Sequence, residues 1–351
     1  MARLARRPRP RQAQARAPSA ASEIPVDLVI LALGADGDGV AEHEGRRVFV
    51  PLTLPGELVR AHLLGPGRLG PGRAEAVEWL VRAPDRAEAP CPHFGRCGGC
   101  RLQHLTPERE AAFKTEQVEL ALARRGLRAD RIDKLVQVGS GARRRAAWSA
   151  RRTRDGVAVG FHARFAREVV AIGPCPALAP ALVDLLPGLS AFMARWLDVG
   201  ETAEILATLA EGGIDLLFAL ARPPGRTARE ALAAFAHEFD LARVSVRAGG
   251  AHDPRAKATE IVAERRSPRA LFAGVAVDLP PGAFLQPSVA GEAAIVAAVA
   301  AAAAGAKRAI DLYAGCGTLT FPLAGAGARV HGVEGDGEMA AALAAAARRS
   351  G

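Results

Sequence analysis

The sequence predicts an α/β multidomain protein: an N-terminal OB-like β-barrel, a central α+β domain and an incomplete Rossmann-like domain. Three observations support this prediction. Short apolar stretches alternate with turn residues over residues 23–84, three cysteines cluster within residues 91–100, and a glycine-rich turn lies between two apolar stretches near residue 315. A length of 351 residues fits two or three domains.

The barrel is predicted from apolar stretches that turn residues separate. We expect strands over residues 26–33, 47–50, 57–64 and 74–81, and several short strands at regular spacing are typical of a small barrel. Residues 1–22 carry six arginines and no acidic residue, which predicts a disordered basic tail. Such a tail either binds phosphate backbones without sequence preference or is an extension that reflects the Arg and Ala bias of the chain. The composition also fits an organelle transit peptide, but weakly.

The composition limits the class of protein. Lys and Arg total 46 against 37 for Asp and Glu, which gives a net charge of +9, and half of the residues are hydrophobic. A core can therefore form, and global disorder is excluded. The longest apolar run, residues 293–306, is too short to span a bilayer. Because no apolar stretch follows the basic start, we expect no secretory signal and a cytoplasmic, reducing location.

Cysteines predict a metal site in the central domain. Three of them have C-x5-C-x2-C spacing, and a fourth follows a Gly-Pro pair farther along. Thiolates are soft ligands that suit an iron–sulfur cluster or zinc, and the adjacent Gly98 and Gly99 let the backbone wrap a bulky centre. Unligated core cysteines fit poorly because the flanks are polar and rich in Gly and Pro. The four are Cys91, Cys97, Cys100 and Cys175.

A basic block at residues 143–154 predicts a strand with an arginine face. Trp148 and two alanines share the opposite face. A half-buried strand of this kind is a candidate surface for a polyanion, and the alternative is a solvated edge strand that charge protects. Taken with the other features, the block favours nucleic acid. The predicted contacts are Arg143, Arg144, Arg145 and Arg151.

The glycine-rich turn predicts a site for an adenosine-type cofactor. It follows an expected strand over residues 309–313, and a second strand, residues 329–334, ends in an acid. An NAD site needs a third glycine where this chain has Thr320, so the turn fits S-adenosylmethionine enzymes better. The predicted binding residues of this unit are Asp311, Gly315, Gly317 and Glu334.

The order of these parts resembles the bacterial RNA uracil-5 methyltransferases that combine a TRAM barrel with a [4Fe-4S] cluster and modify large-subunit ribosomal RNA. The resemblance covers about residues 25–351. It is carried by residues 48–51, 54–57, 91–104, 143–145, 175–176, 284–286, 311–317 and 332–334.

This resemblance assigns roles to segments and residues. It implies a TRAM barrel over residues 23–84, an iron–sulfur and RNA-binding domain over residues 85–280, and the first part of a methyltransferase domain over residues 281–351. It places residues 105–135 against the methyltransferase domain. The resemblance implies that the cluster stabilises the fold and positions the RNA. At one donor contact the chain departs from the family, because Thr318 stands where asparagine is common. The implied donor contacts are Gln286, Tyr313, Thr318 and Glu334.

The resemblance also implies a reaction through a cysteine–uracil adduct. In the family, the nucleophile and the base follow an Asp-Pro-Pro-Arg-like motif, which these 351 residues lack. We therefore expect no catalytic residue here and a monomeric, inactive fragment of a longer enzyme. The alternatives are a non-catalytic iron–sulfur RNA-binding protein and a transfer RNA uracil-5 methyltransferase. A radical methylthiotransferase fits less well because of the x5 spacing and the fourth cysteine.

Overall fold

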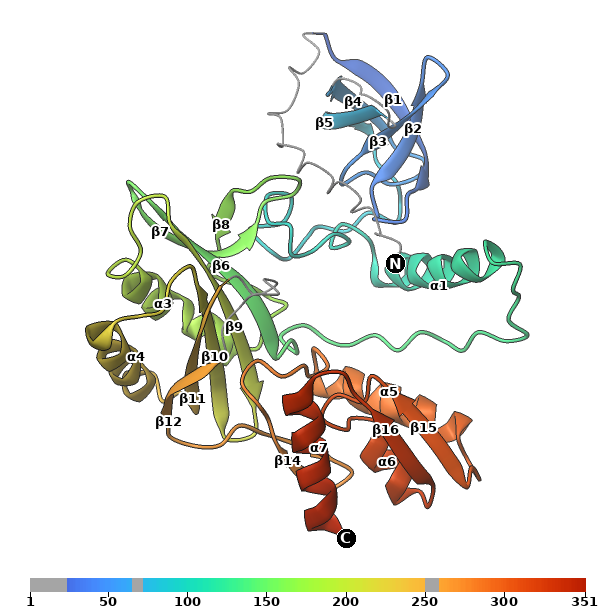
Figure 1. Cartoon of the computed structure of the whole chain (residues 1–351). Coiled ribbons are helices and arrows are strands. Elements are labelled where there is room, and N and C mark those ends of the chain that lie inside the picture. The colour runs from blue at the N-terminus through green and yellow to red at the C-terminus, as the bar shows by residue number, and fades with distance from the viewer. Residues whose placement is uncertain (1–23, 65–71, 250–258) are drawn as a thin grey trace, which may run out of the picture. The chain divides into compact units, whose positions relative to one another are not determined.

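The computed structural model describes residues 24–64, 72–249 and 259–351 (Figure 1). Two compact units are present. The first contains Met1–Glu88 with Arg101–Arg128, and the second contains Ala89–Cys100 with Ala129–Gly351. The predicted basic tail, residues 1–22, lies outside the described residues. Within the described ranges, no helix combines the length and the apolar composition that a membrane crossing requires.

The first unit contains a closed five-stranded barrel with strand order β1-β2-β3-β5-β4, which confirms the predicted barrel. Side chains alternate along the strands, so that Leu28, Ile30 and Val59 fill the interior. The strand β2 was not predicted because Gly39 resembled a turn residue. A Cβ at Gly39 would lie 2.0 Å from the Thr53 hydroxyl, so close packing requires the glycine. The strands are β1 (Val26–Leu33), β2 (Gly39–His43), β3 (Arg46–Val50), β4 (Leu58–Leu63) and β5 (Gly72–Val81).

A buried carboxylate, Glu57, anchors the end of the barrel. Its oxygens accept hydrogen bonds from Trp79 Nε1 at 3.0 Å, from Arg86 Nη2 at 2.8 Å and from the backbone N–H groups of Leu54 and Ala83. Burial alone would raise the pKa of Glu57, but the hydrogen bonds from Arg86 and the backbone hold this pKa below its ordinary value. Glu57 is therefore ionised and fully hydrogen-bonded at neutral pH.

Thr106 and Pro107 are a capping residue and a first-turn proline in sequence and predict a helix start, and helix α1 (Pro107–Ala123) begins there. The Thr106 hydroxyl accepts a hydrogen bond from the N–H of Arg109 at 3.3 Å, and Pro107 occupies the first turn. The one buried side chain of this helix, Phe113, packs with Leu54 and other residues of the first unit. The prediction that this segment packs on a methyltransferase domain stays a prediction.

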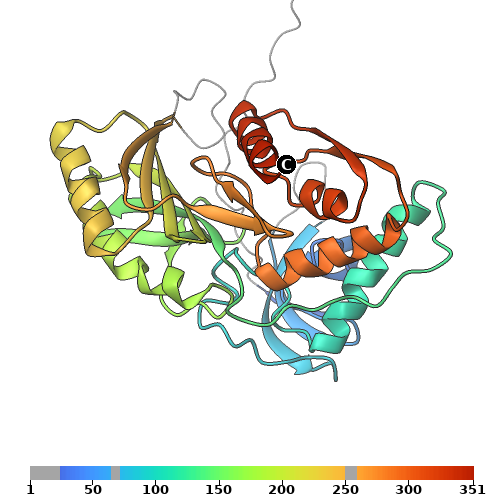
Figure 2. The same ribbon diagram turned by 90° about the horizontal axis from the view of Figure 1, so that it is seen from below.

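The second unit is built around a seven-stranded sheet in the order β12-β11-β10-β9-β6-β7-β8. Trp148, Ile205 and Phe218 share a core with Leu189 and Phe235 of the covering helices, and Figure 2 shows helices against one face of the sheet. The strands are β6 (Arg145–Thr153), β7 (Gly156–His162), β8 (Val169–Ala171), β9 (Thr202–Ala210), β10 (Gly213–Leu220), β11 (Arg243–Ala248) and β12 (Glu260–Glu264).

Three helices cover this face: α2 (Pro180–Asp184), α3 (Leu186–Met193) and α4 (Arg226–Glu238). The sequence predicts a single amphipathic stretch over residues 180–197. The structure divides it into two helices, because Pro187 lacks the N–H that a continuous helix would need there.

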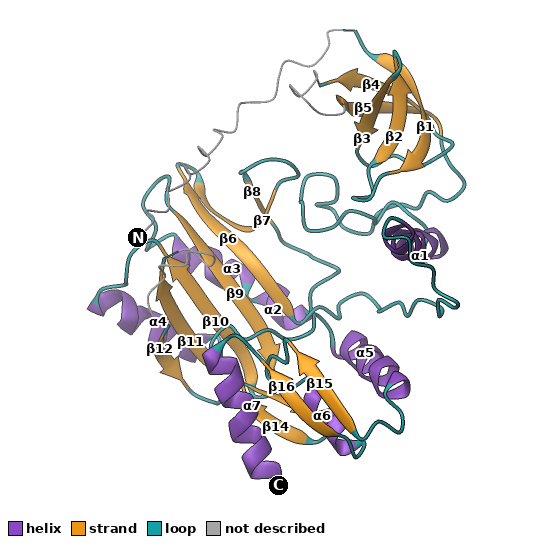
Figure 3. Cartoon of the chain, turned by 45° about the vertical axis from the view of Figure 1, so that its right-hand side comes forward, coloured by secondary structure: helices purple, strands orange, loops and turns teal. Residues whose placement is uncertain are grey.

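The remaining residues of the second unit form small α/β elements around a second core. Leu285, Cys316 and Phe321 meet in this core, and α7 packs beside β14 (Figure 3). The parallel pair of β15 and β16 is the predicted β-loop-α-β unit. The elements are β13 (Arg269–Phe272), β14 (Val275–Asp278), α5 (Val289–Ala302), β15 (Arg308–Leu312), α6 (Thr320–Gly325), β16 (Arg329–Val333) and α7 (Gly337–Ser350).

Candidate functional site

The glycine-rich turn follows β15 directly and has unusual backbone angles. Tyr313 has φ of 58°, Gly315 has φ of 57° and Gly317 has φ of 102°. A Cβ at Gly317 would lie 2.5 Å from the Phe321 ring, so only glycine fits both the angle and the space. Tyr313 adopts the left-handed conformation without being glycine, and its side chain is 92% exposed. Strained residues of this kind cluster at ligand sites.

The predicted acid, Glu334, meets the glycine-rich turn. Its Oε2 accepts a hydrogen bond from the N–H of Gly315 at 2.7 Å, and its Oε1 accepts one from the N–H of Asp336 at 2.8 Å. The hydrogen bonds from Asp336 and Gly315 lower the pKa of Glu334, so the carboxylate is charged at neutral pH. A charged acceptor at the end of the second strand suits ribose hydroxyls.

Asp311 has a partner within the chain. Its carboxylate is buried and accepts a hydrogen bond from the Thr320 hydroxyl at 2.6 Å. This bond ties β15 to the first residue of α6 and thereby fixes the turn between them. Thr318 lies half-buried inside that turn.

The thiol of Cys316 is 1% exposed within the turn. Burial raises its pKa to about 11, and the charges of Asp336 and Glu334 act in the same direction. Because a thiolate is the reactive form of cysteine, this residue is a poor nucleophile at neutral pH.

The other four cysteines line one cavity of about 280 Å³ in the second unit. Burial raises the pKa of the Cys97 thiol, whereas a hydrogen bond from the N–H of Gly99, 3.4 Å from Sγ, lowers it. Charges on the other three cysteines raise it again, because all four thiols are close together. The four are Cys91, Cys97, Cys100 and Cys175.

Backbone contacts hold the cysteine segments in place. The N–H of Gly98 donates to the carbonyl of His162 at 2.8 Å, and a Cβ at Gly98 would lie 2.8 Å from that oxygen. The N–H of Gly173 donates to His93 Nε2 at 3.0 Å, which links the first three cysteines to the segment of Cys175. The cysteine spacing does not predict this role of His93.

The donor set of the cavity fits an iron–sulfur cluster. The cavity is lined by four cysteines and by Arg143 and Arg145, and the N–H of Gly99 donates to the Cys97 sulfur. Cationic groups and N–H donors stabilise an anionic cluster. Among the described residues, no group of three or more His, Cys, Asp or Glu side chains has an arrangement that could hold a metal ion. In a four-iron cluster each thiolate binds a different iron, so its ligands need not converge on one point.

The predicted RNA-binding arginines lie in different surroundings. Ala146, Trp148 and Ala150 are buried on the opposite face, as the alternation predicts. Arg143 is exposed, and Arg151 is half-buried. The Arg144 side chain is only 13% exposed and forms an ion pair with Glu292 at 2.7 Å, so it offers little surface to RNA.

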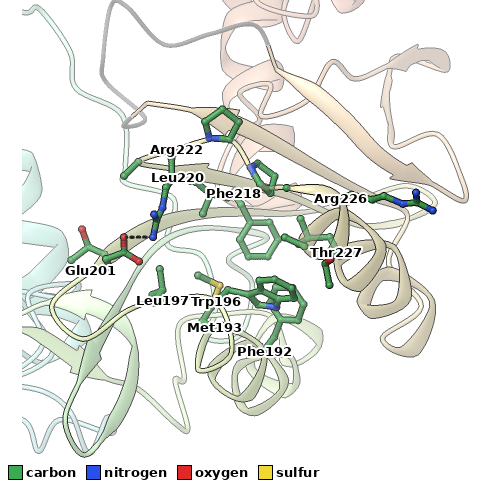
Figure 4. Close-up of a pocket in the computed structure, with 17 residues that line it drawn as sticks. Phe192, Met193, Trp196, Leu197, Glu201, Phe218, Leu220, Arg222, Arg226 and Thr227 are labelled. Carbon is green, nitrogen blue, oxygen red and sulfur yellow. Dashed lines mark hydrogen bonds and ion pairs between the residues drawn. The ribbon is translucent and has the colours of Figure 1, made fainter.

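A second cavity, of about 420 Å³, lies among α3, β10 and α4 (Figure 4). Phe192, Trp196 and Phe218 form part of its wall, and Arg222 at its edge is paired with Glu201 at 3.0 Å. None of the residues that the sequence singles out lines this cavity.

Comparison with known proteins assigns the family. No protein-family model matches the chain. An uncharacterized RNA methyltransferase of Caulobacter vibrioides is 39% identical, and the match covers 91% of this chain and 74% of the relative. The 23S rRNA (uracil(1939)-C(5))-methyltransferase RlmD of Chromohalobacter salexigens is 35% identical over 92% of this chain and 69% of the relative.

A solved structure agrees in fold. The tRNA (uracil-54, C5)-methyltransferase of Pyrococcus abyssi, in complex with S-adenosyl-L-homocysteine, matches with a TM-score of 0.66 over 92% of this chain and 75% of that chain, at 20% identity. The two proteins therefore share a mixed α/β fold. Identity above 30% across nine-tenths of the chain shows more than fold, and we conclude that the chain belongs to the RNA methyltransferase family.

Proposed function

We propose that this chain binds the donor and the RNA for methylation of uracil carbon 5, with 23S ribosomal RNA as substrate and S-adenosylmethionine as donor. The observation that carries the proposal is the pairing of Glu334 with Gly315 at the end of a parallel strand pair, in a chain whose relatives include a 23S rRNA uracil-C5 methyltransferase at 35% identity. A ribosomal substrate implies the cytoplasm as the location, and we expect a monomer.

The donor site is proposed on the turn after β15 and on the segment before α5. The Glu334 carboxylate would accept hydrogen bonds from the ribose hydroxyls, and the exposed Tyr313 ring would cover the adenosine. Thr318 and Gln286 are the other two proposed contacts to the donor. Leu285, the neighbour of Gln286, shares a core with Cys316 of the turn, which supports placing the two segments at one site.

The cysteine cavity is proposed to hold a [4Fe-4S] cluster on Cys91, Cys97, Cys100 and Cys175. Bound there, the cluster would cross-link the cysteine segment to the segment after β8, and it would carry no electrons in the reaction. Arg143, which lines the cavity and is exposed, and Arg151 on β6 would then present cationic groups to RNA phosphates. The barrel, proposed as a TRAM domain, would be a further RNA-binding element.

No residue of this chain is proposed as the catalytic nucleophile. Four cysteines share a cavity, and the fifth is buried with a pKa of about 11. This observation favours a second candidate, a non-catalytic iron–sulfur RNA-binding protein.

Binding and transfer are measured separately to test the proposal. Calorimetry measures binding of S-adenosylhomocysteine, filter binding compares 23S rRNA fragments with transfer RNA, and a labelled donor reports methyl transfer. We expect the chain to bind S-adenosylhomocysteine and to bind 23S rRNA fragments more tightly than transfer RNA. Preference for transfer RNA would favour the transfer RNA alternative. Binding of RNA without binding of S-adenosylhomocysteine would favour the non-catalytic protein and would overturn the proposed donor site.

A further inference from the structure

The segment that carries Gln286 is held by the start of β6. Three successive carbonyl groups of this segment accept hydrogen bonds from two adjacent arginines. The Leu285 carbonyl accepts from Arg145 Nη1 at 3.4 Å, and the Gln286 carbonyl accepts from Arg144 Nε at 3.0 Å. The Pro287 carbonyl accepts from the backbone N–H of Arg144 at 2.7 Å. Residues 284–287 belong to no helix or strand, so these bonds fix their path.

The Arg144 side chain is itself immobilised. Its Nη2 lies 2.7 Å from Glu292 Oε2, and the two side chains are 13% and 11% exposed. Glu292 lies in the first turn of α5, the helix that Ser288 caps. The Arg144 carbonyl accepts a hydrogen bond from the N–H of Leu209 in β9, so the large sheet holds the arginine from behind. The Arg144 guanidinium thus joins the segment of Gln286 to α5, and the Arg144 backbone joins both to the sheet.

We propose that Arg144 is a positioning residue for the methyl donor, and not an RNA contact. It holds the Gln286 backbone so that the Gln286 side chain meets the donor in one orientation. This inference rests on the proposed function, because it takes Gln286 as a donor contact. The sequence grouped Arg144 with Arg143 and Arg151 because all three belong to one basic block, but its burial and its two partners separate it from them.

Removal of Arg144 alone would mix two effects. In Arg144→Met the Glu292 carboxylate stays buried without a partner, which destabilises the fold strongly. The double variant Arg144→Met/Glu292→Met removes both charges and keeps the volume, so the fold is expected to persist. The hydrogen bond to the Gln286 carbonyl is lost in both variants, whereas the backbone bond to Pro287 remains. The double variant therefore isolates the effect on the segment of Gln286.

The experiment uses the full chain and three readouts: S-adenosylhomocysteine affinity, RNA affinity and hydrogen exchange of residues 284–288. For the double variant we expect about a tenfold weaker affinity for S-adenosylhomocysteine (about 1.4 kcal/mol), RNA affinity within about twofold of wild type, and faster exchange in the segment. Arg151→Met serves as the matched contrast, with weaker RNA binding and unchanged affinity for S-adenosylhomocysteine.

Unchanged affinity of the double variant for S-adenosylhomocysteine would overturn the inference. Loss of RNA binding with unchanged affinity for S-adenosylhomocysteine would return Arg144 to the RNA surface. If the wild-type chain itself fails to bind S-adenosylhomocysteine, the proposed donor site falls, and this inference falls with it. Arg144→Lys keeps the charge beside Glu292 but lacks the planar guanidinium that serves two acceptors. We therefore expect its affinity for S-adenosylhomocysteine to lie between those of the double variant and the wild type.

Discussion

Glu334 and Gly315 are joined by a hydrogen bond of 2.7 Å from the glycine N–H to the carboxylate, across two parallel strands. The bond places a charged acceptor beside the turn whose glycines permit close approach of a ligand. The other carboxylate oxygen accepts the N–H of Asp336, so the side chain has one orientation. A ligand that binds here meets an acceptor that is already ordered.

Replacement of Glu334 by alanine is expected to weaken S-adenosylhomocysteine binding by roughly tenfold to a hundredfold, since hydrogen bonds to a charged group contribute about 1.5–3 kcal/mol. Iron content should not change, because Glu334 does not line the cysteine cavity. Calorimetry and iron analysis measure the two effects. Glu338→Ala, an exposed acid in the first turn of α7, is the control. Loss of iron in Glu334→Ala would contradict the separate roles.

Replacement of Cys97 by serine is expected to abolish the iron and the visible absorption of anaerobically purified protein, because serine is a poor ligand for iron. The melting temperature should also fall, since the cross-link to Cys175 is lost. Cys316→Ser is the matched control and should keep its iron, because Cys316 lies outside the cavity. A colourless wild-type protein that contains zinc would refute the cluster.

Cys316 should resist alkylation in the folded chain. With a pKa of about 11, roughly one thiol in a thousand is ionised at pH 8, and burial blocks access to it. Mass spectrometry after iodoacetamide treatment should find Cys316 unmodified until urea unfolds the protein. Labelling of Cys316 as fast as that of a free thiol would show a reactive residue and reopen the question of a nucleophile in the turn.

The barrel should lose stability in acid through Glu57. Its pKa in the folded state lies below the ordinary value of 4.5, so the stabilisation is complete above that value and is lost as the pH falls through the folded-state pKa. Glu57→Gln should destabilise the barrel by about 2–3 kcal/mol at pH 7, and the difference from wild type should shrink in acid. Amide exchange in β4 and β5 measures this, with the exposed Glu78→Gln as control.

Local patterns predicted the parts of the fold that local forces decide. The strand over residues 26–33 matches β1 in full, because it is a short apolar run that a turn follows. The start of α1 was predicted from Thr106 and Pro107 because capping involves neighbours in sequence. Helix α5 was not predicted, because its apolar residues surround the whole helix and give no periodic signal.

In the candidate site, too, local sequence predicts some features and tertiary structure decides the others. Spacing brings the first three cysteines together, and the count of thiols suggested the fourth. The role of Arg144 depends on Gln286 and Glu292, which are 142 and 148 positions away along the chain. Alternation within a strand states which face a side chain occupies, but it cannot state whether a carbonyl or water meets that side chain. Alternation separates Arg144 from Arg143, but only the tertiary structure shows that the Arg144 side chain meets the Gln286 carbonyl and Glu292.

The bond between His93 and Gly173 has a further consequence for assembly of the cysteine cavity. Bringing residues 91–100 and residue 175 together carries an entropic cost that grows with the length of the intervening loop. The hydrogen bond from Gly173 to His93 joins these two segments, and the bond from Gly98 to His162 ties the first of them to β7, so contacts within the chain offset part of that cost. Removal of the inorganic group by a chelator should therefore lower the stability of the second unit without unfolding it.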